Sequence, residues 1–491
     1  MAKKIIIIGG GVAGLSAGIY GALEGYDCTI LERHSCLGGN LTGWNRDGYH
    51  IDNCIHWLTG TAPGTELRGV WETLGALTPQ TEMCRTGRFY GSVYGGQSIS
   101  MLPDADATRE MMLDAAPFDR DAIESFFDAV KLAAQAQTER RLTPKQAARL
   151  GLSMVKYGST DLYGLSARFR HPLLRRVITD YIPGDYVAAG LVWAYAAYTC
   201  GNGGIPMGGS AMMAKRMADR FDSLGGKALT NAEVTGIRLE NTKAVGVTLK
   251  NGEVLYADYV VCACDPEVTF GRLLGKRYCP PYLEKCYKNG EKYPIFSSFH
   301  GAFAADVIPL DLCHNTVTEV RPLCVGSETV SRMVIREYSH DPGFAPSGHT
   351  VLQTVVFQRA ADCEMWQELR KNREAYANKK SELAAEIMCR VEESVPELKG
   401  RLRLLDSWTP ATYNRYFGAN KGAYMSFGVT SGAKRKAVSP RVRGLENVLL
   451  ATQWQKAPGG LPTAALSGRL AVETIAKIEG SRKNLSRAAA I

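Results

Sequence analysis

Several signatures of other protein classes are missing from this chain of 491 residues. Its 13 cysteines include no Cys-x-x-Cys pair and no Cys/His cluster with zinc spacing, so neither a metal site nor a disulfide framework is expected. No stretch reaches the roughly 20 apolar residues of a membrane-spanning helix, and the longest apolar run covers residues 187–200. These absences favour a globular protein of a reducing compartment, and the cytoplasm is the expected location.

A long block of like charges is also missing. Lys and Arg number 58 against 49 Asp and Glu, and no run of basic residues forms a nucleic-acid-binding arm. Base is concentrated only between residues 140 and 176, where Asp161 is the single acid. This region predicts either docking on the inner face of an anionic membrane or an ordinary solvated helical face. Its basic residues are Arg140, Arg141, Lys145, Arg149, Lys156, Arg168, Arg170, Arg175 and Arg176.

The N-terminus contains a strand, a glycine loop and a helix. Residues 5–8 are a buried parallel strand by composition, and residues 9–14 supply Gly-x-Gly-x-x-Gly at the turn into the helix. In this motif Gly9 permits the tight turn and Gly11 lets a pyrophosphate approach the backbone. Gly14 lets the helix pack closely on the strand. The order of elements predicts a dinucleotide-binding unit.

The residues after this loop supply the rest of that unit. Val12 and Ala13 lie in the first helical turn, whose free N–H groups and positive dipole would bind the phosphates. A second strand at 28–31 ends in Glu32, about 20 residues on, where an acid accepts the ribose hydroxyls. An acid at this position favours an unphosphorylated adenosine ribose. The unit alone does not separate NAD from FAD.

The next segments carry a family resemblance. Arg33 follows the acid, a glycine pair with Asn40 lies at 38–40, and a short aromatic strand at 48–52 ends in an aspartate. These segments resemble the phytoene desaturase, carotenoid isomerase and retinol saturase group of the flavin amine-oxidase superfamily, whose pattern ends in Asp-x-Gly. Here Cys54 replaces that glycine, and the Ile-His-Trp run at 55–57 looks more like the retinol saturases. The resemblance implies that Gly38, Gly39 and Asn40 contact FAD.

Three later segments match the same group. A Pro-Met-Gly-Gly-Ser run at 206–210 opens a helix and leads to a strand over 228–237, where the main chain of Val234 would face the adenine. Asn251-Gly252 predicts a hairpin between strands 244–249 and 254–261.

The last matching segment is near the C-terminus. A strand at 447–450 is followed by Gln453 and then by Gly459, Gly460 and Leu461, which open a helix. The resemblance places this helix N-terminus against the flavin ring, where its dipole would favour negative charge at the N1/O2 edge. Gln453 stands where the family often has Gly-Asp, and it would hydrogen-bond the ribityl chain.

The resemblance implies an α/β fold in which a Rossmann-type FAD-binding domain of the glutathione-reductase-like kind is interleaved with an α+β substrate domain. The FAD-binding domain would comprise residues 1–60, 203–265 and 440–478, and the substrate domain 61–202 and 266–439, before a flexible tail at 479–491. The first insertion is predicted mostly helical, over 119–137, 144–157 and 172–182. The second is predicted to contain strands 295–304 and 349–357 and a helix at 371–395.

Catalytic candidates follow from where the resemblance puts the ring. His56 would lie beside it, and an ordinary histidine pKa near neutrality suits proton transfer, although a structural histidine bonded to backbone is the alternative. Trp57 would pack near the ring or wall the pocket, and Tyr424 is a reserve acid. His300 is interpreted as structural. Aromatic residues that would line an apolar slot or fill the core are Phe299, Trp366, Trp408, Tyr413, Tyr416, Tyr424 and Phe427.

The function therefore predicted is FAD-dependent hydride transfer on the C–C or C=C bonds of an apolar polyene or isoprenoid-like molecule, by desaturation, saturation or isomerisation. Oxidation of an amine is one alternative, and a flavin-free prenyl-protein escort is another. No second strand, glycine loop and acid mark an NAD(P)H domain, so the expected electron partner is a quinone, oxygen or a separate carrier.

Overall fold

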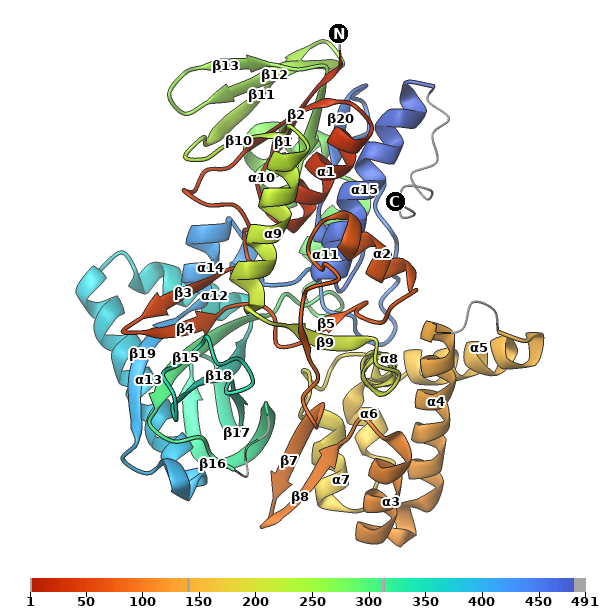
Figure 1. Ribbon diagram of the computed structural model, residues 1–491, viewed down its shortest axis with the longest axis vertical. Coiled ribbons are helices and arrows are strands. Elements are labelled where there is room, and N and C mark those ends of the chain that lie inside the picture. The colour runs from red at the N-terminus through yellow and green to blue at the C-terminus, as the bar shows by residue number, and fades with distance from the viewer. Residues whose placement is uncertain (1, 139–141, 311, 313, 481–491) are drawn as a thin grey trace.

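The structure is a computed structural model that describes residues 2–138, 142–310, 312 and 314–480. A parallel sheet forms the centre of the upper part of the molecule (Figure 1). The five strands lie in the order β10-β2-β1-β14-β20 and every neighbouring pair is parallel. They come from three distant segments of the chain: β1 and β2 from the first, β10 and β14 from the second, and β20 from the third. Their bounds are β1 Lys4–Ile8, β2 Asp27–Leu31, β10 Lys227–Leu229, β14 Tyr259–Cys262 and β20 Val448–Leu450.

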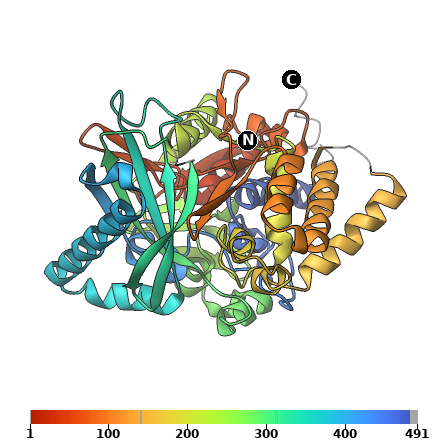
Figure 2. The ribbon, with the colours of Figure 1, turned by 90° about the horizontal axis from the view of Figure 1, so that it is seen from below.

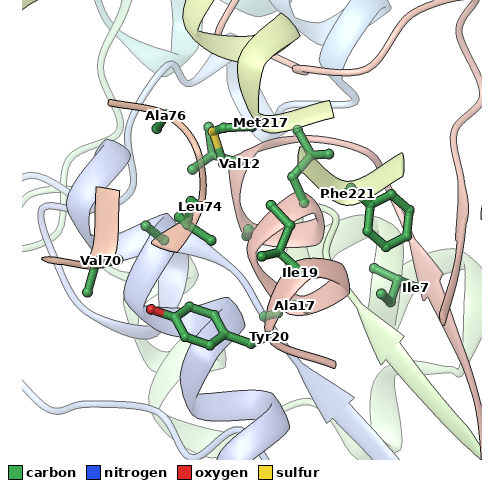
Figure 3. Packing of buried hydrophobic residues seen from close by; sticks show 14 of the residues in the cluster. Ile7, Val12, Ala17, Ile19, Tyr20, Val70, Leu74, Ala76, Met217 and Phe221 are labelled. Carbon is green, nitrogen blue, oxygen red and sulfur yellow. The ribbon is translucent and has the colours of Figure 1, made fainter. Parts of the chain in front are cut away.

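Three helices pack on this sheet and on one another. They are α1 (Val12–Leu23), α9 (Gly209–Ser223) and α15 (Leu461–Ile478). Small residues make the α1–α15 contact close: a Cβ on Gly468 would lie 2.4 Å from the Ala13 carbonyl oxygen. Figure 3 shows Ile19 of α1 near Phe221 of α9, both almost completely buried. Each such side chain contributes about 1.5–3 kcal/mol to stability through burial. Buried residues of the sheet and of these helices belong to one hydrophobic core.

The glycine-loop unit is confirmed as α/β, but two predicted strands are wrong in their bounds. The strand expected over 228–237 is divided between β10 and β11 (Val234–Glu240). The strand expected over 254–261 is likewise divided. Its first half is β13 (Val254–Tyr256), which pairs with β12 (Lys243–Leu249) in an antiparallel meander, whereas its second half is β14 of the parallel sheet. Apolar runs do not reveal where a chain crosses between sheets.

A seven-stranded mixed sheet forms the centre of the second part, in the order β19-β15-β18-β17-β16-β7-β8. One face packs on α12 (Ala360–Leu369) and α13 (Arg373–Ser394) through Phe299, Phe303 and Trp366. The other face looks toward the cavity described below. The strands are β7 Tyr90–Tyr94, β8 Gln97–Met101, β15 Ser297–Ala305, β16 Asn315–Val325, β17 Glu328–Glu337, β18 Thr350–Gln358 and β19 Leu402–Trp408.

The predicted helix near 371–395 and two of these strands, β15 and β18, are present as expected. The other five strands were not predicted, and the expectation of a mostly helical first insertion is incomplete because β7 and β8 join this sheet. Its helices are α2 Glu66–Thr73, α3 Ala105–Ala115, α4 Arg120–Thr138, α5 Pro144–Gly158, α6 Leu162–Ser166, α7 Pro172–Thr179 and α8 Ala188–Thr199. The remaining elements are β3 Gly43–Arg46, β4 Tyr49–Asp52, β5 Leu58–Thr59, β6 Met83–Cys84, β9 Gly203–Pro206, α10 Pro266–Val268, α11 Pro281–Lys288 and α14 Pro410–Phe417.

Two predicted features fall wholly or partly outside the described residues. Arg140 and Arg141 lie outside them, as does the expected tail from residue 481 onward. Glu479 is described and is anchored, because it accepts a hydrogen bond from the Tyr259 hydroxyl and pairs with Lys3 at 3.2 Å. Within the described ranges no helix is long and apolar enough to cross a membrane.

Candidate active site

A cavity of about 1580 Å³ lies where the carboxyl ends of the parallel strands face the mixed sheet. Ile8 ends β1 and Gly9 follows it, Leu31 ends β2 and Glu32 follows it, and Ala263 follows β14. All of these residues line the cavity. Ligands of open α/β sheets bind at this edge. A single small-molecule pocket usually measures about 300–1,000 Å³, so this cavity has room for a dinucleotide and a second molecule.

The cavity brings together residues that lie far apart in the sequence. Gly14 is the one predicted cofactor residue that does not line it: a Cβ there would lie 1.9 Å from the Gly9 carbonyl oxygen, so Gly14 lets the helix pack closely on the strand, as expected of it. The predicted cofactor residues that line the cavity are Gly9, Gly11, Val12, Ala13, Glu32, Arg33, Gly38, Gly39, Asn40, His56, Val234, Gln453, Gly459, Gly460 and Leu461.

The glycine loop leaves a cradle in the cavity wall. Gly9 has a φ of 106°, which disfavours any residue with a side chain. A Cβ on Gly11 would meet nothing closer than 3.9 Å, so the space above it is open. Gly11 is the N-cap of α1 and gives it no side-chain cap, which leaves the first N–H groups of the helix for a ligand. This geometry fits a pyrophosphate.

Glu32 is fixed at the end of β2 by backbone donors. Its carboxylate accepts hydrogen bonds from Gly10 N at 2.8 Å and His34 N at 3.0 Å, and only 8% of the residue is exposed. Each carboxylate oxygen retains a further lone pair. Ribose hydroxyls would find an acceptor here, beside the loop cradle.

A chain of hydrogen bonds runs along the opposite side of the cavity. The Gln453 amide oxygen accepts from Gly460 N at 2.8 Å, at the start of α15. Its amide nitrogen and that of Asn40 donate to the Tyr424 carbonyl oxygen at 3.5 and 3.4 Å. Asn53 in turn donates to Asn40 Oδ1 at 2.9 Å. The N-terminus of α15 is thereby tied to the loop after Glu32 across the cavity wall.

The same chain continues into the mixed sheet. The Tyr413 hydroxyl donates to Asn53 Oδ1 at 3.2 Å and accepts from Trp408 Nε1 at 3.0 Å. His300 stacks on Trp408 with ring centroids 4.6 Å apart, and its Nε2 lies 2.7 Å from Ser298 Oγ. His300 therefore has the structural role expected of it, although it also lines the cavity. One polar ladder joins the two parts of the molecule.

His56 lies in the cavity wall between β4 and β5, and its carbonyl oxygen accepts from His314 Nε2 at 2.9 Å. Burial lowers the pKa of His56 well below its usual range, and the Arg336 and His314 charges act in the same direction. The expectation of a histidine that titrates near neutrality is therefore wrong, because burial beside the Arg336 cation disfavours the imidazolium and leaves a neutral ring with one N–H. His56 can act as a neutral donor or acceptor.

Trp57 and Tyr424, the other two catalytic candidates, also line the cavity. The Trp57 ring contacts the Phe89 ring edge to face at 5.4 Å, and Gly203 leaves room for it, since a Cβ there would lie 2.9 Å from the indole. Burial raises the pKa of Tyr424 well above its usual range, so its phenol stays neutral. All three candidates line the aromatic part of this cavity, which is called the chamber below.

The aromatic candidates divide between cavity and core. Phe299, Trp366 and Phe427 pack in hydrophobic clusters and do not line the cavity, so they fill the core, which was the alternative to the slot. Trp408, Tyr413, Tyr416 and Tyr424 line the cavity as expected. Aromatic residues that sequence reasoning missed there are Trp44, Tyr181, Tyr186, Trp193, Phe357, Tyr376, Phe417 and Trp454.

Sequence reasoning also missed Arg336, which reaches the cavity from β17. Its strand alternates between buried Met333 and Ile335 on one side and Arg332, Val334 and Arg336 on the other. A strand with buried Met and Ile on one face and arginines on the other is a signal for a sheet whose second face meets a polar cavity.

Comparisons with known proteins agree with this site. A family model described as flavin containing amine oxidoreductase matches residues 12–476. Prolycopene isomerase 2, chloroplastic, of an Oncidium hybrid cultivar is 26% identical over 452 residues, covering 85% of this chain and 74% of that protein. The lycopene-forming phytoene desaturase of a Paracoccus strain is 24% identical over 454 residues, covering 87% of each.

Among solved structures, an oxidoreductase from Methanosarcina mazei is similar with a TM-score of 0.59 and 19% identity, covering 96% of this chain and 100% of that one. This likeness shows the fold, and the family match extends from the start of α1 into α15 and includes the mixed sheet. The α/β class and the resemblance to the carotenoid-related flavoproteins are confirmed. The chain belongs to the flavin-containing amine oxidoreductase family and is a flavin-dependent oxidoreductase.

Proposed function

We propose that the protein holds one FAD non-covalently and acts on the C–C or C=C bonds of an apolar polyene or isoprenoid-like substrate. The observation that carries the proposal is the single cavity in which the glycine-loop cradle, the N-terminus of α15 and an aromatic-lined chamber are continuous. The relatives named as a prolycopene isomerase and a phytoene desaturase support this substrate class.

FAD is proposed as the particular flavin because the cavity provides for its adenosine end. The cradle at Gly11 suits a pyrophosphate and Glu32 suits a ribose, and Val234 lines the wall where an adenine would follow. A flavin mononucleotide has no such end. When bound, FAD supplies hydride transfer. The protein's own residues then bind and orient the substrate and exclude water.

Within this chamber His56, Trp57 and Tyr424 are the proposed catalytic residues. Neutral His56 offers one ring N–H and one lone pair, so it can orient a substrate or relay a proton without gaining charge. Trp57 supplies an apolar wall, and the buried Tyr424 phenol is a weak acid that remains protonated. A hydrocarbon substrate needs little else from the protein.

We expect the reaction rate to show no inflection from His56 between about pH 6 and 9. Because burial lowers the pKa of His56 in the folded protein, the ring is already neutral throughout this interval. The His56→Asn variant should reduce flavin about tenfold more slowly, with a pH profile parallel to that of the wild type. The measurement is anaerobic stopped-flow absorbance. An inflection near neutrality that disappears in the variant would contradict the neutral-ring assignment.

The amine-oxidase alternative is disfavoured by charge. Arg336 places a permanent cation in the chamber, which opposes a protonated amine. Asp406, one of the acids that line the cavity, is already paired with Arg46 at 3.1 Å and Lys380 at 3.8 Å. The family match also favours an enzyme over a flavin-free prenyl-protein escort.

The test of the function is spectroscopic. The purified protein should show a flavin band near about 450 nm and release FAD on denaturation. Anaerobic titration with a carotenoid polyene should then bleach the oxidised flavin if the reaction is a desaturation, or reoxidise the reduced flavin if it is a saturation. If the reaction is an isomerisation, it should require reduced flavin and leave the amount of reduced flavin unchanged. Quinone, oxygen and a separate carrier are the proposed electron partners, and each can be added in turn to restore the resting state. A protein that stays colourless after reconstitution with FAD would refute the proposal.

We further propose that α5 attaches the protein to the inner, anionic face of a membrane. Leu152 and Val155 on this helix are 73% and 71% exposed, and Lys145, Arg149 and Lys156 flank them without any acid in the helix. The helix projects from the body in Figures 1 and 2. It also contacts α8, whose Trp193 is 41% exposed and lines the cavity, so a lipid-soluble substrate could enter beside it.

The attachment can be tested by flotation with vesicles. The double variant Leu152→Asp/Val155→Asp should lose at least tenfold in affinity for vesicles rich in phosphatidylglycerol, because both apolar burial and charge attraction are weakened. Tyr256→Asp is the matched control, since Tyr256 is 68% exposed on β13 in the other part of the molecule. The proposal that α5 binds the membrane would be ruled out if all three proteins bound the vesicles equally. It would also be ruled out if the wild type bound only vesicles of neutral phosphatidylcholine.

A further inference from the structure

Arg336 is a cation in the chamber without an anionic partner. Its Nε donates to the Asn315 amide oxygen at 3.2 Å, and the Tyr338 hydroxyl is its other close polar neighbour. Both are neutral groups. Among the residues that the structure describes, no carboxylate pairs with this guanidinium, although most buried or half-buried charges in proteins are paired.

The nearby acids are all engaged elsewhere. Glu337, the next residue, accepts from the Thr350 hydroxyl at 2.5 Å and from Ser339 N at 2.6 Å. Asp180 shares a small side pocket with Arg336 but forms a two-pronged pair with Arg332, at 2.5 and 2.8 Å. Among the described residues, therefore, no carboxylate forms an ion pair with Arg336.

The other described groups close to Arg336 include histidines and apolar side chains. His56, His300 and His314 are its buried neighbours, and burial with the Arg336 charge holds the pKa of each below the usual range. Val355 and Phe357 of β18 supply the apolar surface beside it. A guanidinium in such surroundings is a strong site for a planar anionic group, because the low dielectric strengthens the attraction and the fork matches a carboxylate.

The position of Arg336 separates it from the expected dinucleotide loops. The side pocket that it borders, of about 20 Å³, is lined by neither the Gly9–Gly14 loop nor the N-terminus of α15. That pocket is large enough for about one water. The anion must therefore approach from the large cavity, past the aromatic walls at Tyr181 and Phe357.

We propose that Arg336 binds a carboxylate at one end of an otherwise apolar, chain-like substrate. The inference rests on the proposed function, which it narrows from a polyene hydrocarbon to a polyene or isoprenoid acid. The guanidinium fixes the charged end at the mixed sheet, so that the position of the reacting carbon is set by its distance along the chain. Arg336 is thus a positioning residue that determines specificity.

The test compares two probes that share one polyene chain: one ends in a charged carboxylate and the other in an uncharged ester. All-trans-retinoate and its methyl ester are titrated into the holoenzyme at neutral pH, and binding is followed by the flavin absorbance. The wild type should bind the acid at least tenfold more tightly than the ester, as expected for a charge-assisted hydrogen bond in a partly buried site. Arg336→Gln should lose this preference while its affinity for the ester is unchanged, and Arg336→Lys should keep part of it.

Arg321→Gln is the matched control. Arg321 lies on β16 of the same sheet, on the surface, where it pairs with Glu393 at 3.0 Å. It should retain the full preference for the acid. Equal affinity of the wild type for both probes would overturn the proposal. So would an Arg336→Gln protein that keeps its preference for the acid but changes its flavin midpoint potential, since Arg336 would then act on the flavin.

These outcomes are independent of turnover. A protein that prefers the acid through Arg336 but neither desaturates, saturates nor isomerises a polyene supports the anchor and refutes the proposed reaction. A protein that converts polyene hydrocarbons and shows no preference for the acid supports the reaction and refutes the anchor.

Discussion

A Gly11→Val protein should fold normally and carry no FAD. Gly11 has an extended backbone with φ of −73°, so valine is conformationally acceptable there. Its side chain would instead fill the open cradle above the glycine loop, where the structure has no protein atom within 3.9 Å of a Cβ. The pyrophosphate would lose its place at the N-terminus of α1. We expect FAD affinity to fall more than about 100-fold and activity to fall with it.

Flavin content after gel filtration measures the first effect, and the far-UV circular dichroism spectrum checks the fold. Gly290→Val is the matched control, because Gly290 is exposed and a Cβ there meets nothing within 4 Å. It should bind FAD as the wild type does. A yellow Gly11→Val protein with full activity would show that the dinucleotide does not use this loop.

The largest stability effect is expected at Asp52. Its buried carboxylate accepts from Ser210 N and Oγ, both at 2.6 Å, and from Cys54 N and Ile55 N at 2.9 and 3.0 Å. It thereby joins β4 to the first turn of α9, where the helix dipole also favours negative charge. Asp52→Ala would leave buried N–H groups without acceptors, and the expected loss in the free energy of unfolding is about 3–5 kcal/mol.

Urea denaturation with FAD in excess measures this loss. Asp52→Asn should lose less, because its amide oxygen can still accept from Cys54 N while only the Ser210 N–H loses its acceptor. Asp219→Ala on the same helix is the control: Asp219 is an exposed partner of Lys215 at 2.6 Å, and its removal should cost less than about 0.5 kcal/mol. If the Asp52→Ala and Asp219→Ala proteins unfolded at the same urea concentration, the carboxylate would have no structural role.

Local motifs made the cofactor half of the site predictable. The spacing from Gly9 to Glu32 fixes a strand, turn, helix and strand by short-range rules, and the glycine pairs at 38–39 and 459–460 mark further turns in which side chains are disfavoured. Each of these segments presents backbone to the cavity. A pattern that depends on backbone alone can be read without knowing the tertiary contacts.

The substrate half could not be predicted in the same way. Arg336 and Phe357 come to the cavity only because β17 and β18 pair in one register, with Arg336 opposite Gln353 and Val334 opposite Val355. A shift of β17 by one residue would have turned Arg336 to the other face of the sheet. Phe299 illustrates the converse, since its neighbour His300 faces the cavity and it therefore faces the core. His56 differs again: its position was predicted, but its pKa depends on neighbours supplied by β15 and β17.

The order of the parallel sheet also governs when the site can exist during synthesis. Val260 of β14 pairs with Val448 of β20, and α1 is covered by α15. The parallel sheet and α1 therefore cannot complete their packing until β20 and α15 have been synthesised. A nascent chain halted before residue 448 has an unpaired strand edge and an uncovered helix, which favour aggregation. Capture of the cofactor therefore requires β20 and α15 to have been synthesised, and added flavin should not rescue a chain terminated before residue 448.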